Sequence, residues 1–512
     1  MPKPETIRRL APLYKRFSMD RAHAEHVAAL CDRVFLELPH LHGLTKTCRR
    51  LVEAAALLHD IEEAGGKERH DLLGARRIGR LQIAGLPERW QSVIVQAVRL
   101  HSTRSDVPGF LARLEKRGGP ELELAARVAA ILRIADGLDH CREQDTEIAA
   151  VADDGEAVEI FLSPSPHAAD NAQFALRKAD LWNRVCLRPI GRIAAVEGDV
   201  PSAALVQPRQ PMREAARRIL QRQFEQFVSR EYGVTYGEDP EYIHEMRVAM
   251  RRFRSALVAL RGHVGPAVRQ PGKRLSALAE GLGAVRDTDV FLEYLKAYAA
   301  GAPRSHRPVL RRILDESGQR RQAEYRHLSS LGGPTYREVT AQLRQALRPR
   351  DSRASAGGRG GTLAVRPAWR EARRCLRQCL ERLLKHGRRL KDLPPRQQHL
   401  VRIDCKRLRY LAEFFQGFYG RQFAETIKTA VALQDLLGQV HDSYVYAEWL
   451  KEEARPPADR AGKGGAAIAA LLDHLRRQRR DSLDRADKRW KSFRGRKAIG
   501  RLVGIIKEPR RT

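Results

Sequence analysis

Apolar residues recur at intervals of three and four positions along most of the chain, a spacing that predicts amphipathic helices. The pattern runs through residues 1–142 and returns over 212–348 and 368–491, with Pro- and Gly-rich turns between successive helices. Within the middle stretch we expect helices at roughly 213–231, 241–263, 268–284, 287–300, 304–328 and 335–347.

A different pattern occupies residues 147–163, where two short apolar runs flank Asp153-Asp154-Gly155. Two such runs around a turn predict a β-hairpin, and residues 187–196 are expected to add a third strand. The fold class is therefore predicted to be mainly α, with a small β-sheet appended to the first helical domain.

Two stretches rich in Pro, Gly and small residues divide the chain, and we interpret them as linkers. The first covers 197–211, and the second, at 349–367, is also basic. The predicted organisation is a first domain at 1–196, a helical repeat at 212–348, a second helical repeat at 368–500 and a basic tail at 501–512.

The second half of the chain contains a segment that occurs twice, offset by 155 residues. LGAVRDTDV at 282–290 falls on LGQVHDSYV at 437–445, and 43 residues separate both His244 from Asp287 and His399 from Asp442. A shared offset over this distance predicts duplicated units of one fold. The basic residues His244, Arg247, Arg251, Arg252 and Arg254 align with His399, Arg402, Lys406, Arg407 and Arg409.

Each repeated segment predicts a helix with one cationic and one apolar face. At about 100° per residue, His244, Arg247, Arg251 and Arg254 fall on one stripe, whereas Met246, Met250, Phe253 and Leu257 fall on the opposite side. Like charges four residues apart repel by about 0.2–0.5 kcal/mol per pair. One such helix is best interpreted as a solvated basic face, but two copies in register favour an anion-binding ridge.

The net charge of +32 is distributed unevenly. Residues 1–200 hold 29 of the 94 Lys and Arg and 29 of the 62 Asp and Glu, so they are neutral, and 201–512 carry the whole excess. A field of this size attracts polyanions. Nucleic acid, an anionic membrane and inorganic polyphosphate are the candidate partners.

Other classes of protein are disfavoured by composition. No apolar run reaches the length of a signal peptide or of a membrane span, so a cytoplasmic location is expected. Seven scattered cysteines without a C-x-x-C motif are interpreted as reduced thiols. Aromatic residues make up 6% of the chain and none alternates with the ridge cations as a stacking platform would, which argues against a nucleic-acid binder.

The first domain contains an ordered series of potential metal ligands. His59 and Asp60, the candidate catalytic pair, are adjacent at the end of the apolar run AAALLHDI. Imidazole and carboxylate together suit divalent Mn, Fe, Zn or Mg, and such an ion polarises a phosphoryl group and lowers the pKa of bound water. Each histidine alone is typical of a structural residue, but the ordered set favours a metal site. Its other members are His26, His70, His101 and Asp136.

This ordered set resembles the HD superfamily of metal-dependent phosphohydrolases. The resemblance implies a primary metal site formed by His26, His59, Asp60 and Asp136, with His70 and His101 supporting a second metal. More narrowly, the segments HAEHV, EAAALLHDI, ILRIADGLDHCR and QFALRKADLW are similar to the C-terminal HD region of the exopolyphosphatase/guanosine pentaphosphate phosphohydrolase family over most of residues 15–195. Glu62 replaces the glycine that usually follows His-Asp-Ile. The actin-like catalytic module of that family has no counterpart here, so its exopolyphosphatase reaction is not carried over.

The repeated HxxRVxxRR and HxxRIxxKRLRY helices, each followed by LGxxxD, resemble the CHAD family, a helical domain named for its histidines, over about 212–500. The resemblance implies two helical bundles with approximate two-fold symmetry, whose ridges line a basic cleft that binds inorganic polyphosphate. Arg286 corresponds to His441, so the two halves of the cleft are not expected to be equivalent. Asp287 and Asp442 are expected to orient Arg or His. The implied binding residues are His244, Arg247, Arg251, Arg252, Arg254, Lys273, His399, Arg402, Lys406, Arg407, Arg409 and Lys428.

Together these patterns predict a cytoplasmic polyphosphate-binding protein with a metal-dependent HD phosphohydrolase-like domain, acting at polyphosphate or its granules. Two alternatives stay open, a non-catalytic scaffold associated with granules and a nucleic-acid-binding protein. The substrate of the HD domain, the identity of the metal and the oligomeric state are not fixed by these patterns.

Overall fold

The computed structural model describes residues 12–62, 69–81, 83, 87–196, 206–236, 239–349, 366–419, 421–453, 462–507 and 509. It is mainly α-helical with one small sheet, which confirms the predicted fold class. The chain forms two compact units, the first made of residues 1–205, 221–249 and 348–350 and the second of 206–220, 250–347 and 351–512. Most of the two expected linkers, at 197–205 and 350–365, and the end of the tail lie outside the described residues.

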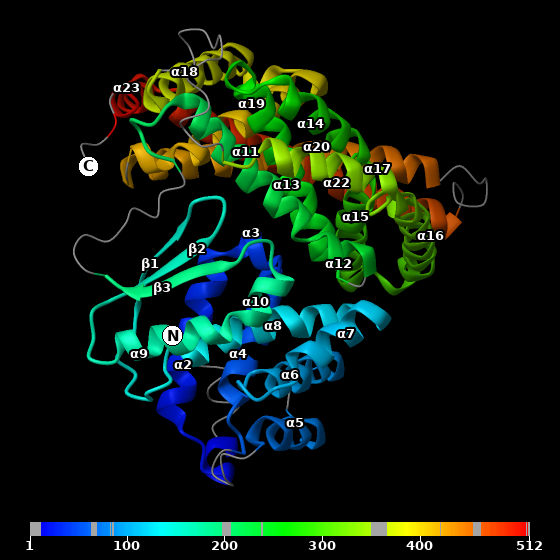
Figure 1. Ribbon diagram of the computed structural model, residues 1–512. Helices are drawn as coiled ribbons and strands as arrows, with labels where there is room; N and C mark the ends of the chain where they lie inside the picture. The colour runs from blue at the N-terminus through cyan, green and yellow to red at the C-terminus, as the bar shows by residue number, and fades with distance from the viewer. Residues whose placement is uncertain are drawn as a thin grey trace. The chain divides into compact units, whose positions relative to one another are not determined.

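Helix α8 (Pro120–Gly137) is the central element of the first unit. Its sequence AARVAAILRIA is apolar almost all round, the pattern of a fully buried helix. It packs against α2, α4, α6, α9 and α10 (Figure 1). The helices of this unit are α2 (Arg21–Glu37), α3 (Pro39–His42), α4 (Arg49–Leu58), α5 (His70–Arg80), α6 (Glu88–Leu100), α7 (Val107–Arg117), α9 (Ala168–Lys178), α10 (Asp180–Val185) and α12 (Glu231–Tyr236).

The small sheet has the predicted hairpin and third strand. Strands β1 (Ile148–Asp153) and β2 (Val158–Leu162) pair antiparallel around Gly155, whose φ of 99° suits the turn. Strand β3 (Ile190–Ala195) pairs parallel to β2, so the order is β1-β2-β3. A parallel pair needs a crossover, and α9 and α10 supply it, with α9 packed on β3.

The boundary between the units falls within α11 (Met212–Val228) and α13 (Pro240–Ala259). The predicted helix 241–263 ends at Ala259, and residues 261–263 form a short 3-10 turn. The other helices of the second unit are α14 (Pro266–Leu278), α15 (Gly281–Gly301), α16 (Arg307–Arg326), α17 (Pro334–Ala346), α18 (Ala368–His386), α19 (Pro395–Phe414), α20 (Arg421–Glu453), α22 (Gly462–Phe493) and α23 (Arg496–Ile505).

The two repeats differ in where the helix that contains LGxxxD begins. The predicted helices 268–284 and 287–300 are separated at 279–280 instead of 285–286, so the first LGxxxD lies inside α15. A Cβ on Gly281 would lie 2.9 Å from Leu328 Cδ2, so the close approach at the start of α15 favours glycine. In the second repeat α20 is one continuous helix through the same motif.

An apolar core joins the two repeats within the second unit. Helices α15, α16, α20 and α22 lie side by side (Figure 1). No helix among the described residues combines the length and apolarity needed to cross a bilayer. The buried side chains of this core are Phe291, Leu295, Leu310, Ile313, Tyr446, Leu450, Ile468, Leu471 and Leu475.

Candidate metal centre and basic cavity

Histidine and aspartate side chains from several helices meet in the first unit. Helices α4 and α6 end immediately before His59 and His101, α5 begins at His70, and Asp136 lies in the last turn of α8. Three overlapping groups have ligand atoms within 4.8 Å of one another, and together we name them the His–Asp cluster. Five of the six predicted ligands are brought together here. The members of the cluster are His23, His59, Asp60, His70, His101 and Asp136.

His23 takes the place in this cluster that the sequence analysis gave to His26. His23 Nε2 lies 3.2 Å from His59 Nε2 and 3.5 Å from Asp136 Oδ1. His26, three residues later on α2, has a buried Nε2 with no partner among the described residues. Three helical residues leave the two side chains about 60° apart around the axis of α2, and His26 is less buried than His23. His23 continues the fully buried stripe of Val27 and Val34, and this periodicity was the signal in the sequence that favoured it.

The rings of the cluster are held with Nε2 pointing inward. Nδ1 of His59 donates to Ala56 O at 2.7 Å, and Nδ1 of His101 donates to Val98 O at 2.6 Å. A carbonyl oxygen can only accept, so both rings carry a proton on Nδ1, and in the neutral imidazole this leaves a lone pair on Nε2. The Nε2 atoms of His70 and His101 are 3.1 Å apart. Such facing nitrogens, with carboxylates beside them, fit a divalent cation.

Asp60 lies between two pairs of histidines. Its Oδ2 is 3.5 Å from His59 Nε2 and 3.7 Å from His23 Nε2. Its Oδ1 is 3.4 Å from His101 Nε2 and 3.7 Å from His70 Nε2. Each oxygen of Asp60 therefore faces a different pair, so the donor set fits two cations that share this carboxylate.

Two basic side chains, Lys178 and Arg142, contact carboxylates of the His–Asp cluster, and the sequence analysis did not assign either of them to the site. Lys178 Nζ pairs with Asp136 Oδ2, and Arg142 Nη2 donates to Asp60 Oδ2 at 2.6 Å. Burial opposes ionisation of Asp136, but Lys178, His23 and His59 together outweigh it and hold the pKa of that carboxyl well below its usual range. Arg142 has a φ of 60°, a left-handed conformation that is uncommon outside glycine and is often found at functional sites. Arg142 lies in ILRIADGLDHCR and Lys178 in QFALRKADLW, two of the segments that resemble the phosphohydrolase family. This resemblance was the signal in the sequence that could have identified both residues.

Buried Arg133 fixes the position of His101. Its Nη1 donates to the carbonyls of Leu100 and Ser102, each at 2.6 Å, on either side of His101. Its Nη2 pairs with Asp180 at 2.7 Å. Arg133 lies on α8 one turn before Asp136, so it ties the end of α6 to the aspartate of the cluster.

Other acidic groups of this unit have cationic partners. Glu62 pairs with Arg77 Nε. Asp153 and Glu225 both pair with Arg188, and His40 Nε2 lies 2.8 Å from Asp153. The group of His40, Asp153 and Glu225 is therefore a buried ion-pair network that needs no metal.

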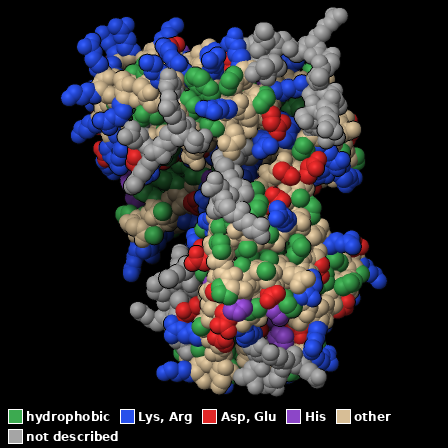
Figure 2. Space-filling view, turned by 60° about the vertical axis from the view of Figure 1, so that its left-hand side comes forward, with side chains coloured by type: hydrophobic (Ala, Val, Ile, Leu, Met, Phe, Trp, Pro, Cys, Tyr) green, Lys and Arg blue, Asp and Glu red, His purple; other side chains and the backbone are tan. Residues whose placement is uncertain are grey.

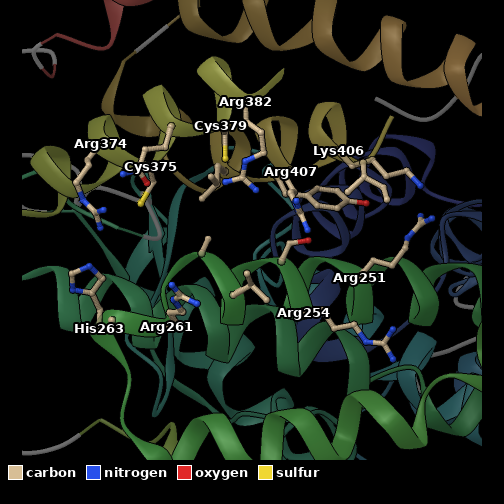
Figure 3. A pocket seen from close by; sticks show the side chains of 18 residues that line it. Arg251, Arg254, Arg261, His263, Arg374, Cys375, Cys379, Arg382, Lys406 and Arg407 are labelled. Atoms are coloured by element: carbon tan, nitrogen blue, oxygen red, sulfur yellow. The ribbon is translucent and has the colours of Figure 1, made fainter. Parts of the chain in front are cut away.

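The second unit contains a cavity of about 700 Å³ between α13, α18 and α19 (Figure 3). We name it the basic cavity, because seven Lys and Arg side chains line it and none of its lining residues is acidic. Lys and Arg side chains, blue in Figure 2, also cover much of the surface shown for this unit. The seven cations are Arg251, Arg254, Arg261, Arg374, Arg382, Lys406 and Arg407.

Four of the predicted polyphosphate ligands line the basic cavity: Arg251, Arg254, Lys406 and Arg407. The other eight do not line it. Arg252 and Arg409 both pair with Glu413, each at 2.7 Å. Lys273 and Lys428 are exposed, and Lys428 pairs with Glu425. The remaining four, half-buried on α13 or α19, are His244, Arg247, His399 and Arg402.

Two arginines that line the basic cavity, and Arg402 on the neighbouring part of α19, each have an Nε atom without a hydrogen-bond partner among the described residues. The Nε atoms of Arg251, Arg254 and Arg402 are buried with no acceptor among the described residues. A buried donor left unsatisfied costs about 1–3 kcal/mol, and more when it is charged. Burial lowers the pKa of Arg402, and the charge of Arg251 adds to this against the attraction of Asp442. An anion would satisfy these donors.

A pair of histidines distinguishes the second repeat from the first. The Nδ1 atoms of His399 and His441 are 3.2 Å apart, and their rings are 4.3 Å apart between centroids. Burial, with Arg402 and His399 beside it, lowers the pKa of His441 to about 4. At the corresponding position of the first repeat, Arg286 pairs with Glu293 at 3.1 Å.

Three of the cavity cations were missed because they lie outside the repeated segment. Arg374 and Arg382 are on α18, and Arg261 is in the 3-10 turn after α13. Figure 3 shows Arg382 and Arg407, from α18 and α19, near each other on the side of the cavity opposite Arg254 and Arg261. The signal for the first two was the alternation of exposed cations and buried leucines along α18.

Comparison with protein families finds two domains in this chain. Ppx/GppA phosphatase, domain III, matches residues 5–184, and the CHAD domain matches residues 218–451. The His–Asp cluster lies in the first match and the basic cavity in the second. No curated protein matches the chain. Both domains are consistent with a function related to polyphosphate.

Two solved structures are similar to parts of the chain. The crystal structure of the CHAD domain from the plant Ricinus communis is 25% identical, with a TM-score of 0.44, and covers 61% of this chain and 99% of its own. PptA from Streptomyces chartreusis is 15% identical, with a TM-score of 0.42, and covers 55% of this chain and 100% of its own. On the two family matches, the chain carries a Ppx/GppA-like domain fused to a CHAD domain.

Proposed function

We propose that this protein binds inorganic polyphosphate in the basic cavity and carries a metal-dependent phosphohydrolase centre at the His–Asp cluster. The observation that carries the first part is the lining of the cavity, seven Lys and Arg without an acidic residue, together with the buried Nε atoms of Arg251 and Arg254, which have no acceptor in the described part of the chain. Arginine forks and lysine ammonium groups at close spacing are suited to a chain of phosphates. Association with polyphosphate granules would follow from this binding.

The shape and chemistry of the cavity favour polyphosphate over nucleic acid. Tyr410 is the aromatic residue among its lining side chains, so successive bases would find no stacking platform. A duplex is also too wide for a cavity of about 700 Å³. A thin phosphate chain can instead contact α13, α18 and α19 at once.

For the second part, His23, His59, Asp60, His70, His101 and Asp136 would hold one or two divalent cations, with Mn, Fe, Zn and Mg as candidates. A cation bound there would polarise a phosphoryl group and lower the pKa of bound water. The cationic groups of Arg142 and Lys178 are placed to hold an anionic phosphoryl oxygen at the edge of the cluster. The substrate class is a phosphate ester or anhydride.

A non-catalytic polyphosphate-binding scaffold is the second candidate, and one observation favours it. Lys178 and Arg142 already neutralise one oxygen each of Asp136 and Asp60. If these ion pairs persist in the working protein, the cluster is a structural network in place of a metal centre. Metal content therefore separates the two candidates.

Competition between polyanions tests the binding proposal. The full-length chain is loaded with labelled long-chain polyphosphate at fixed ionic strength and titrated with unlabelled polyphosphate or duplex DNA at equal phosphate concentration. We expect polyphosphate to compete at least about tenfold better, since salt-dependent counterion release acts for both ligands and only the cavity discriminates. Equal competition by DNA would assign the binding to a diffuse basic surface.

Polyphosphate binding is also expected to depend on pH through His441. In the free protein the imidazole is neutral at neutral pH because burial, Arg402, His399 and Lys406 lower its pKa to about 4. A polyanion bound nearby would raise this pKa, so binding takes up a proton, and affinity increases as the pH falls through the raised pKa toward about 4, by at most about tenfold per pH unit for each proton.

The variant His441→Arg is the matched control, because it places there the residue type of the first repeat and keeps a fixed positive charge. Its affinity should change less with pH than that of the wild type, as measured by calorimetry in buffers of different ionisation enthalpy. Identical pH profiles for the two proteins would exclude His441 as the source of the proton.

A further inference from the structure

The basic cavity continues into a second groove on the outer side of α18. This groove has a volume of about 630 Å³, and we name it the α18 groove. It shares Arg374 and Gln378 with the lining of the basic cavity. The two spaces are therefore contiguous along one helix. The groove is lined by Trp369, Arg370, Arg373, Arg374, Arg377, Gln378 and Glu381.

The helical phase of α18 explains why cations gather there. At about 100° per residue, Arg370, Arg374 and Arg377 lie within about 60° of one another. All three are exposed, whereas Leu376 and Leu380 on the other side of the helix are buried. The exposed face is therefore a cationic stripe supported by an apolar one.

Two arginines of the groove form no ion pair among the described residues, although Arg370 Cζ lies over the Trp369 ring, 5.4 Å from its centroid. Arg373 donates to Lys507 O at 3.2 Å, and Arg374 pairs with Glu371 at 2.7 Å. Arg370 and Arg377 form no ion pair with any described residue, although Glu381 lies one turn beyond Arg377. Their guanidinium groups are therefore available to a ligand in the groove.

We infer that the α18 groove is a second subsite for a linear phosphate polymer, occupied by the part of a long chain that leaves the basic cavity past Arg374. The inference rests on the proposed binding of polyphosphate in the cavity. Arg382 in the cavity and Arg370 in the groove are twelve residues apart on α18, about 18 Å at 1.5 Å per residue. A short oligophosphate held in the cavity does not reach Arg370, but a long chain does. The subsite therefore makes affinity depend on chain length.

The test compares two double variants of the full-length chain, Arg370→Gln with Arg377→Gln, and Arg477→Gln with Arg480→Gln. The second pair is the matched control, since it removes two exposed arginines from α22. Dissociation constants are measured by calorimetry for tripolyphosphate and for long-chain polyphosphate at several salt concentrations.

The groove variant is expected to bind long-chain polyphosphate about tenfold more weakly and to bind tripolyphosphate as the wild type does. Its slope of log Kd against log salt should fall by about 1.4 for long chains, taking about 0.7 for each lost contact with a single-stranded polyanion. The control variant should leave both ligands unchanged. Trp369 gives an independent readout. Its fluorescence is obtained as the difference between the wild type and Trp369→Phe. Long-chain polyphosphate should alter this fluorescence, and tripolyphosphate should not alter it.

Loss of affinity for both ligands in the groove variant, or equal loss in the control, would overturn the subsite. If the wild type binds neither ligand, the proposed function itself fails. This outcome is distinguishable because the wild-type measurement alone shows it, without any variant. If the wild type binds both ligands and the groove variant matches it for both, only the subsite is refuted.

Discussion

Replacing Arg251, Arg254, Lys406 and Arg407 together by Gln is expected to weaken long-chain polyphosphate binding at least about a thousandfold. A hydrogen bond to a charged group contributes about 1.5–3 kcal/mol, and partial exposure of these side chains reduces that figure. Four contacts at about 1 kcal/mol each already correspond to about three powers of ten, at 1.4 kcal/mol per factor of ten. Calorimetry at fixed ionic strength measures the loss, and thermal unfolding confirms that the variant is folded.

The matched comparison uses one cation from each repeat. Arg251→Gln with Lys406→Gln removes two residues that line the basic cavity, whereas Lys273→Gln with Lys428→Gln removes two exposed residues that do not. The change in net charge is the same, so only position differs. We expect about a hundredfold loss for the first pair and less than about threefold for the second. Similar losses for both pairs would mean that net charge alone drives binding.

The cationic helices could be predicted from the sequence because the duplication fixes their register. The offset of 155 residues aligned Arg251 with Lys406, and both line the cavity. Alignment of two residues by this offset does not mean that both of them line the cavity. Arg407 lines the cavity, but its counterpart Arg252 turns to Glu413, because α18 closes the cavity on one side and no equivalent helix of the first repeat lines it.

The members of the His–Asp cluster could be predicted from the sequence about as well as the cationic helices. Adjacent His59 and Asp60 at the end of an apolar helix identified the centre of the cluster. The order of the other candidate ligands along the chain identified the helices that contribute to it. The choice between His23 and His26 depends on the helical phase of α2 against α4 and α8, which the periodicity of Val27 and Val34 indicates. Lys178 and Asp136 are 42 residues apart in the sequence, so their ion pair depends on the tertiary packing of α9 on α8.

His23→Ala is expected to lower the affinity of the full-length chain for Mn²⁺ by about a hundredfold or more, and His26→Ala is expected to leave it unchanged. Loss of a group that only orients a ligand costs about 10–100-fold in metal affinity, so loss of a ligand itself should cost at least the upper end of this range. His23 Nε2 faces His59 and Asp136 at 3.2 and 3.5 Å, whereas His26 is not part of the cluster. The two variants remove the same side chain from the same helix three residues apart, so they form a matched pair.

Metal content by elemental analysis and Mn²⁺ titration by calorimetry give the readout, with thermal unfolding measured in chelator to detect loss of fold. His59→Ala with Asp60→Ala should abolish stoichiometric binding, because Asp60 faces both histidine pairs and His59 belongs to one of them. Polyphosphate binding should be unchanged in this double variant, since none of the residues lining the basic cavity is altered. Equal metal loss in His23→Ala and His26→Ala would contradict the ligand assignment. A wild-type chain that takes up no divalent cation would instead favour the scaffold, with Lys178 and Arg142 as permanent partners of Asp136 and Asp60.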